Sequence, residues 1–204
     1  MTDAGVPASL SHGEIADEPM SWPVVASEEV YRSGWVVSLR QDVITRPDHD
    51  EQFTRIVIQD PGAVVVLAID DSDRVVLVRQ YRHAARMRLL QLPAGVLDEP
   101  GEDARHAAAR ELREEAGLEA AHWEHLLTCY PTPGKSEETQ AFFLARGLRE
   151  VDPGFEPTHE EAEMTVERVP FDDVVAAVLE GRAQDGPLAI AVLAHDARRH
   201  RAPA

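Results

Sequence analysis

The residues best suited to chemistry are carboxylates grouped in one short stretch of the chain. Glu111, Glu114 and Glu115 follow one another closely in "RELREEAGL". Residues 103–116 lack Pro and Gly and are rich in Ala, Leu, Glu and Arg, which predicts a helix. On such a helix Glu111 and Glu115 lie about 40° apart and Glu114 about 60° to the other side. All three carboxylates therefore point into one sector.

Carboxylates this close repel one another, so they need either full exposure to water or a bound cation. Glu102, at the helix start, can turn toward the same place, and Arg110 can pair with Glu114 one turn later. Clustered carboxylate oxygens are the ligands that Mg²⁺ or Mn²⁺ prefers. A solvated acidic surface helix accounts for the helix equally well, so both interpretations stay open at this point.

The composition limits the partners that the protein can have. Its 204 residues include 20 Lys and Arg against 37 Asp and Glu, a formal net charge of −17. This excess of acid argues against nucleic acid and anionic membranes as partners, because both attract basic residues. A phosphorylated substrate would need metal ions and locally placed arginines. No apolar run approaches the ~20 residues that span a bilayer. The only cysteine, Cys129, excludes an internal disulfide, so we expect a cytoplasmic protein.

The remaining sequence predicts one α+β domain with a mixed β-sheet. Residues 1–27 mix Gly, Pro, Ser and acids without period and predict a disordered tail. Residues 28–60 contain β-branched, partly alternating stretches and predict an N-terminal antiparallel strand extension; residues 61–204 form the main domain. Within that domain we expect strands in residues 62–70, 74–82, 89–95, 123–130, 139–148 and 163–170, with helices in 171–181 and 187–200. The first two of these strands, joined by "DSD", predict a hairpin or a close relative of one.

The spacing of the acidic stretch resembles the Nudix box. Glu102 is followed by seven residues and then by "RELREEAGL", which matches each later fixed position of that motif through Gly117 and Leu118. There is one departure: six residues rather than five separate Gly95 from Glu102. The resemblance implies an α/β/α sandwich and a hydrolase acting on nucleoside diphosphates linked to another moiety.

The resemblance also implies roles for particular residues. Glu111 and Glu115 would be metal ligands, Glu114 a further ligand or support, and Glu102 an accessory acid. The carbonyl of Ala94 would offer a backbone ligand. Arg110 would orient the glutamates. The cofactor would be Mg²⁺ or Mn²⁺, which neutralises a diphosphate and lowers the pKa of a bound water.

The sequences flanking the box are similar to the ADP-ribose pyrophosphatase branch of that family over most of residues 30–195. This implies hydrolysis of ADP-ribose to AMP and ribose 5-phosphate. Arg82 and Arg55 would contact the diphosphate or a ribose, Trp35 would stack on adenine, and Glu138 would complete the substrate site. Surface ion pairs for the two arginines and a core position for the tryptophan are the plain alternatives. Two departures, Gln91 in place of a frequent Glu and Lys135 in place of a frequent aromatic residue, bear on substrate preference.

Relatives of this branch carry a catalytic glutamate in a loop after the box. The segment "PGFEPTHEEAEM" corresponds to that loop, and Glu160 and Glu161 are the candidates for the base. The branch also implies a homodimer in which residues 28–60 reach the partner's site. The alternatives are a pyrophosphatase for other nucleotide sugars, dinucleotides or coenzyme A, or a non-catalytic nucleotide-binding sensor. The retained box glutamates favour an enzyme.

Overall fold

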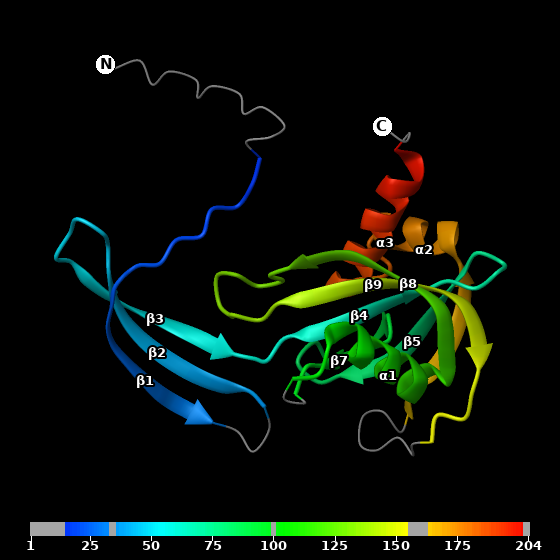
Figure 1. Cartoon of the computed structure of the whole chain (residues 1–204), viewed down its shortest axis with the longest axis horizontal. Helices are drawn as coiled ribbons and strands as arrows, with labels where there is room; N and C mark the ends of the chain where they lie inside the picture. The colour runs from blue at the N-terminus through cyan, green and yellow to red at the C-terminus, as the bar shows by residue number, and fades with distance from the viewer. Residues whose placement is uncertain (1–14, 33–35, 99–100, 155–162, 202–204) are drawn as a thin grey trace.

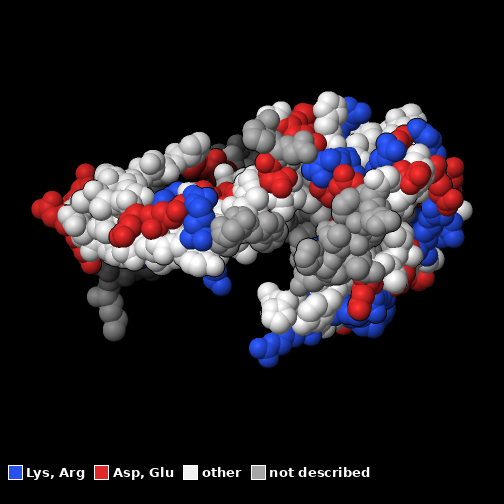
Figure 2. All heavy atoms as spheres, turned by 90° about the horizontal axis from the view of Figure 1, so that it is seen from below, with Lys and Arg blue, Asp and Glu red and all other residues white. Residues whose placement is uncertain are grey.

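A computed structural model of the chain describes residues 15–32, 36–98, 101–154 and 163–201. Figure 1 shows an arm of strands extending from a body in which strands lie between helices. The arm and the body form two lobes in Figure 2, with a hollow between them. A cavity of about 590 Å³ lies where the two lobes meet, lined by Arg32, Ser38 and Gln59 of the arm and by Leu97, Asp98 and Glu102 of the body, among others.

The arm is an antiparallel sheet in the order β1-β2-β3. Its strands are β1 (Val24–Arg32), β2 (Ser38–Thr45) and β3 (Gln52–Gln59). The predicted strand extension is therefore present, but it begins earlier than predicted. Residues 24–27, which are predicted to end the disordered tail, are part of a strand. Val24 pairs with Ile44 and Ala26 with Val43, so residues 24–27 already belong to β1. The β-branched residues Val24 and Val25 favour an extended conformation. Whether they join a sheet depends on β2, which lies later in the sequence.

The body contains two further sheets. One is mixed, in the order β7-β4-β9-β8, with β4 and β9 parallel; the other is antiparallel, in the order β10-β5-β6. The strands are β4 (Ala63–Ala68), β5 (Arg74–Arg82), β6 (Met87–Gln91), β7 (Ala94–Val96), β8 (Leu118–Cys129), β9 (Gln140–Glu150) and β10 (Thr165–Pro170). The predicted mixed sheet is confirmed.

The predicted hairpin between β4 and β5 differs from the structure. The two strands join different sheets and share only an isolated bridge between Ile69 and Val75. The turn itself is tight, since Asp73 has a positive φ of 56° and donates its amide to the carbonyl of Asp70. β4 instead pairs along its length with β9, which is distant in sequence and lies beyond the reach of a local pattern.

In the part of the chain that the structure describes, three helices cover the two faces of the body: α1 (Ala104–Ala116), α2 (Phe171–Leu179) and α3 (Gly186–His200). Figure 1 shows α1 on one side of the strands and α2 with α3 on the other. β4 is apolar throughout because both of its faces are covered. Val64, Val66 and Ala68 share a core cluster with Ala107, Ala108 and Leu112 of α1. Val65 and Leu67 share another with Phe171, Val174, Leu188 and Val192 of α2 and α3.

The layered arrangement confirms the expected α/β/α sandwich, which buries apolar side chains on both faces of a sheet. Helix α1 begins and ends at polar signals visible in the sequence. Asp103 accepts hydrogen bonds from the amides of Arg105 and His106, and Gly117 ends the helix with a left-handed φ of 62°. Among the described residues, no helix is both long and apolar enough to span a bilayer.

Candidate active site

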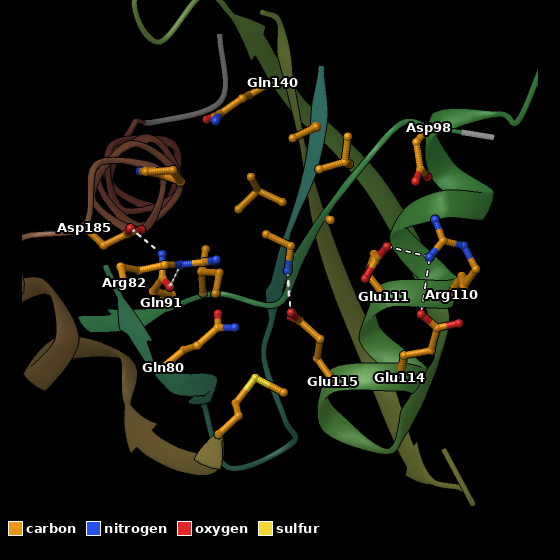
Figure 3. Close-up of a pocket in the computed structure, with 18 residues that line it drawn as sticks. Gln80, Arg82, Gln91, Asp98, Arg110, Glu111, Glu114, Glu115, Gln140 and Asp185 are labelled. Atoms are coloured by element: carbon orange, nitrogen blue, oxygen red, sulfur yellow. Dashed lines mark hydrogen bonds and ion pairs between the residues drawn. The ribbon is translucent and has the colours of Figure 1, made fainter. Parts of the chain in front are cut away.

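A cavity of about 460 Å³ lies beside α1 in the body of the molecule. Two walls of opposite chemistry face each other across it (Figure 3). The α1 wall carries Arg110, Glu111, Glu114 and Glu115, and the opposite wall carries Gln80, Arg82, Gln91 and Asp185. Met164, Gln140 and residues of β4 and β7 line the rest. The three helix glutamates thus open onto one cavity, as the helical spacing predicts.

Arg110 is the centre of the acidic wall. Its Nη1 donates to Glu111 Oε1 at 2.6 Å and to Glu114 Oε2 at 3.3 Å. Its Nη2 donates to Glu102 Oε2 at 3.2 Å. These bonds, with that to Glu102 contributing most, raise the pKa of Arg110 further above its ordinary value although burial opposes the charge. The predicted pairing with Glu114 is confirmed, and the same guanidinium also offsets part of the repulsion between Glu111 and Glu102.

The loop before α1 fits closely against the helix glutamates. The amide of Ala94 donates to Glu115 Oε2 at 2.9 Å. At Gly95, a Cβ atom would lie 2.0 Å from the Glu111 carboxylate, closer than any real contact. Only glycine leaves room for that carboxylate, so Gly95 places Glu111 at the cavity wall. The additional residue between Gly95 and Glu102 leaves this fit and the helix register intact.

The donor set suits a hard divalent cation, although the carboxylates are not gathered around one point. Within the described parts of the chain, no group of three or more His, Cys, Asp or Glu side chains has the spacing to hold a metal ion. The hydrogen bonds of the acidic wall explain this, because Arg110 draws Glu102, Glu111 and Glu114 toward itself while Glu115 bonds the Ala94 amide. The atoms that these glutamates offer to a metal are all oxygens, which Mg²⁺ and Mn²⁺ prefer, and the Glu111 carboxylate packs directly against Gly95.

The opposite wall is built by a chain of three polar side chains. Arg82 Nε donates to Gln91 Oε1 at 2.7 Å, and Gln91 Nε2 donates to Asp185 Oδ2 at 2.7 Å. Asp185 in turn caps α3, since its Oδ1 accepts from the amide of Leu188 at 2.9 Å. Figure 3 shows Arg82 and Gln91 beside Asp185, across the cavity from the α1 glutamates. The positively charged guanidinium of Arg82 therefore faces the glutamates of α1. This arrangement suits a phosphate ligand that is bound together with a metal ion.

Two amide side chains of the cavity have unused hydrogen-bonding atoms. Gln80 is 3% exposed, and its Oε1 has no partner among the described residues. The Oε1 of Gln140 is also buried without a partner, while its Nε2 donates to Glu138 at 2.7 Å. Buried polar atoms without partners are costly, so these two oxygens mark places beside the cavity where the fold tolerates that cost.

Comparison with known proteins agrees with this geometry. A family model described as NUDIX domain matches residues 59–190, more than half of the chain. The chain belongs to the Nudix family. It is 41% identical over 168 residues to the ADP-ribose pyrophosphatase of Mycobacterium tuberculosis (strain ATCC 25618 / H37Rv), covering 82% of this chain and 80% of that protein.

Other relatives are similar over the same span. The ADP-ribose pyrophosphatase of Bacillus subtilis (strain 168) is 30% identical, and the methanol dehydrogenase activator of Bacillus methanolicus is 33% identical. Each match covers 82% of this chain and 89% of the relative. A crystal structure of an ADP compounds hydrolase superposes with a TM-score of 0.71 at 21% identity, covering 90% of this chain and 96% of that one. That likeness supports the Nudix fold.

Several residues that the Nudix resemblance selected lie elsewhere. Arg55 is exposed on β3 of the arm, with its guanidinium 4.4 Å from the Phe53 ring centroid. Glu138 does not line the cavity but holds Gln140, which does. The predicted substrate residue Trp35 and the predicted bases Glu160 and Glu161 lie outside the described residues.

Reasoning from the sequence missed Asp185 and Gln80 as cavity residues of this Nudix chain. Asp185 precedes "GP" at the start of α3, a signal that identifies a helix cap but not a cavity wall. Gln80 lies in the polar run of residues 79–82 that ends β5, and nothing in that run shows which of its side chains faces a cavity. Both depend on the packing of α3 and β5 around the cavity, which the sequence pattern does not contain.

Proposed function

We propose that this Nudix protein hydrolyses the pyrophosphate bond of ADP-ribose, giving AMP and ribose 5-phosphate. The observation that carries the proposal is the acidic wall of α1 facing Arg82 across one cavity. A diphosphate fits between them because one wall supplies a guanidinium and the other supplies oxygen ligands for a cation. The relatives named ADP-ribose pyrophosphatase, at 41% and 30% identity, support ADP-ribose as the substrate.

A divalent cation, Mg²⁺ or Mn²⁺, is part of this proposal. Glu111 and Glu115 would hold it, with the Ala94 carbonyl and Glu102 as further ligands. When bound, the cation supplies positive charge against the diphosphate oxygens and acidifies water in the cavity. Without the cation, Arg110 orients the glutamates through its hydrogen bonds, and Glu114 shares that guanidinium with Glu111.

The chain's own residues bind the substrate and move the proton. The guanidinium of Arg82, which lines the cavity, would bond the diphosphate oxygens. Glu160 or Glu161 would take the proton of the attacking water; both remain predictions. The described residue Met164 lines the cavity and the carbonyl of Glu163 accepts from Arg88 at 3.1 Å, so the chain returns to the cavity directly after that segment.

A second candidate substrate class is another nucleotide sugar. The GDP-mannose pyrophosphatase of Yersinia pestis (strain Pestoides F) is 30% identical over 143 residues, covering 67% of this chain and 71% of that protein. The departures at Gln91 and Lys135 also bear on this choice. ADP-ribose remains first because the similarity to its hydrolases is higher and extends over more of the chain.

The assembly and location belong to the same proposal. We propose a homodimer in which the arm reaches the partner's cavity and brings Arg55 and Trp35 toward the substrate. We also propose a cytoplasmic location, where nucleoside diphosphate derivatives are present.

The test is a panel of ADP-ribose, GDP-mannose, dinucleotides and coenzyme A with Mg²⁺, with products identified by mass spectrometry. We expect AMP and ribose 5-phosphate from ADP-ribose, no turnover in excess chelator, and recovery when metal is restored. Glu115→Gln should lower kcat by ~100-fold or more, roughly 3 kcal/mol of barrier, because it removes a charged metal ligand. Glu180→Gln, an exposed glutamate at the end of α2, is the matched control.

Full turnover in chelator, or normal kcat in a folded Glu115→Gln protein, would contradict the metal assignment. Binding of ADP-ribose without any turnover would indicate the sensor instead.

A further inference from the structure

Arg82 is oriented by a hydrogen-bond chain that starts at the cap of α3. The chain runs from Asp185 through Gln91 to Arg82, with both side-chain links at 2.7 Å. Its members come from three separate parts of the sequence: the end of β5, the end of β6 and the residue before α3. Asp185 is buried, at 7% exposure, and is fixed by its bond from the Leu188 amide.

The direction of each bond follows from the chemistry of Asp185. A carboxylate only accepts hydrogen bonds, so it must face the nitrogen of the Gln91 amide. The oxygen of the same amide is thereby turned toward Arg82, where it accepts from Nε. This use of Nε leaves both Nη groups of Arg82 for the cavity.

Arg82 differs in this respect from other arginines of the body. Arg79 is paired with Glu167 at 2.7 Å, and Arg110 is paired with three glutamates. Among the described residues, the hydrogen-bond partner of the Arg82 guanidinium is the neutral amide of Gln91. The amide fixes the direction of the guanidinium without neutralising its charge, which stays available for an anionic ligand.

We propose that Asp185 and Gln91 are positioning residues that hold the guanidinium of Arg82 toward the diphosphate of the substrate. The inference rests on the proposed function for the identity of that ligand. It also assigns a reason to Gln91: a glutamate there would bring two carboxylates to 2.7 Å, so Asp185 requires an amide as its neighbour.

A different pair of side chains can complete the same hydrogen-bond chain, and this allows a test by substitution. In Asp185→Asn the cap of α3 is kept, because asparagine is as good a cap as aspartate. Its amide nitrogen, however, now faces Gln91, so Gln91 turns over and presents its own nitrogen to Arg82. In the double variant Asp185→Asn with Gln91→Glu, the asparagine nitrogen donates to one carboxylate oxygen and the other accepts from Arg82. The chain is then complete again with the roles exchanged.

The experiment is a double-variant cycle with three readouts: the melting temperature without substrate, kcat/KM for ADP-ribose with Mg²⁺, and the Kd of inorganic pyrophosphate in excess chelator. We expect Asp185→Asn alone to lower kcat/KM and weaken pyrophosphate binding about tenfold, with a melting temperature about 2–4 °C lower. Gln91→Glu alone should lower the melting temperature and kcat/KM, and weaken pyrophosphate binding, by at least as much. The double variant should recover the melting temperature of the parent and should lose less kcat/KM and less pyrophosphate affinity than the two single losses combined, because the chain is complete again although the new carboxylate partly neutralises the Arg82 guanidinium.

Two further variants give the largest loss to be expected and a control for the helix cap. Arg82→Ala sets the full loss, and in its background the Asp185→Asn change should have no further effect on pyrophosphate binding. Asp103→Asn is the matched control, since the Asp103 side chain caps α1 by accepting from the backbone amides of Arg105 and His106. This substitution should change kcat/KM less than twofold.

Losses that simply add in the double variant would overturn the inference, as would an unchanged kcat/KM in Asp185→Asn. A parent protein that does not hydrolyse ADP-ribose would instead contradict the proposed function. In that case the melting temperatures and the pyrophosphate constants still decide whether the chain positions Arg82.

Discussion

At the scale of single residues, Gly95 matters because of the atom that it lacks. The Glu111 carboxylate occupies the space that a Cβ would take, at 2.0 Å. The contact is with the far end of a flexible side chain, so Gly95→Ala should displace Glu111 rather than unfold the protein. We expect kcat for ADP-ribose to fall at least tenfold while the melting temperature changes by no more than about 4 °C, the shift from ~1 kcal/mol in a chain of this size.

Gly134→Ala is the matched control, because a Cβ there meets nothing within 4 Å. It should leave kcat and melting temperature unchanged. If Gly95→Ala instead keeps the parental kcat, the position of Glu111 at the cavity wall is not needed for turnover.

The residues of the acidic wall could be predicted from the sequence because one helix carries them. Their spacing on α1 and the stop at Gly117 are local properties, and both are confirmed. The opposite wall could be predicted only in part, since the resemblance selects Arg82 and singles out Gln91 but indicates neither Asp185 nor the bonds between the three side chains. Arg82, Gln91 and Asp185 meet only after β5, β6 and α3 have packed together, and no local pattern records which of their polar atoms will bond.

At the scale of elements, strand patterns identified the strands but not all of their partners. The apolar runs of β4 and β5 predict a hairpin, yet β4 pairs with β9 because the central position of a sandwich needs neighbours on both sides. The composition of the first residues of β1 predicts a tail, because the pairing partners that make them a strand lie at residues 42–44. Sequence periodicity therefore predicts the α+β class and a sheet covered by helices. The order of the strands depends on long-range packing, which periodicity does not record.

Helix α3 contains a buried histidine that links its packing to pH. His195 is 7% exposed and packs edge-to-face on Phe171, with ring centroids 5.4 Å apart. Burial lowers the pKa of His195, and the positive charges of Arg146 and Arg199 lower it further, while Glu124 and Asp73 act in the opposite direction. The folded protein therefore prefers the neutral imidazole, whereas the unfolded chain binds the proton at its ordinary pKa of 6.5.

The sign of the pH effect follows from this difference. Above pH 6.5 both states are neutral at His195 and its contribution is complete; as the pH falls below 6.5 the unfolded state gains a proton first and stability is lost. We expect the free energy of unfolding, from urea titrations between pH 7.5 and 5, to fall by at most about 1.4 kcal/mol per pH unit from this group. His195→Gln should remove that slope, and His122→Gln, at an exposed position on β8, should retain it. An equal slope in the His195 variant would assign the effect to other groups.

At the scale of the whole molecule, the arm is the feature that the fold of one chain leaves unexplained. β1 is exposed along its entire length, and it is an edge strand of the sheet. Apolar side chains lie open on the arm, with Val24, Val25, Val30, Tyr31 and Ile56 between 46% and 59% exposed. Long open edges and exposed apolar groups are what proteins usually cover, so a second copy of the chain would give the arm a packing surface.

We therefore expect a dimer of twice 22.5 kDa by light scattering at micromolar concentration. Replacing Val30 and Ile56 together by Asp should favour the monomer, because charges in a desolvated interface are costly. If the arm also completes the partner's site, the same variant should lose kcat/KM for ADP-ribose while its melting temperature becomes independent of protein concentration. Leu179→Asp, at an apolar position on α2 that is 71% exposed, is the matched control and should stay dimeric and active. A parent protein that is monomeric at micromolar concentration and fully active would exclude both the dimer and the shared site, and the exposed strands of the arm would then need another partner.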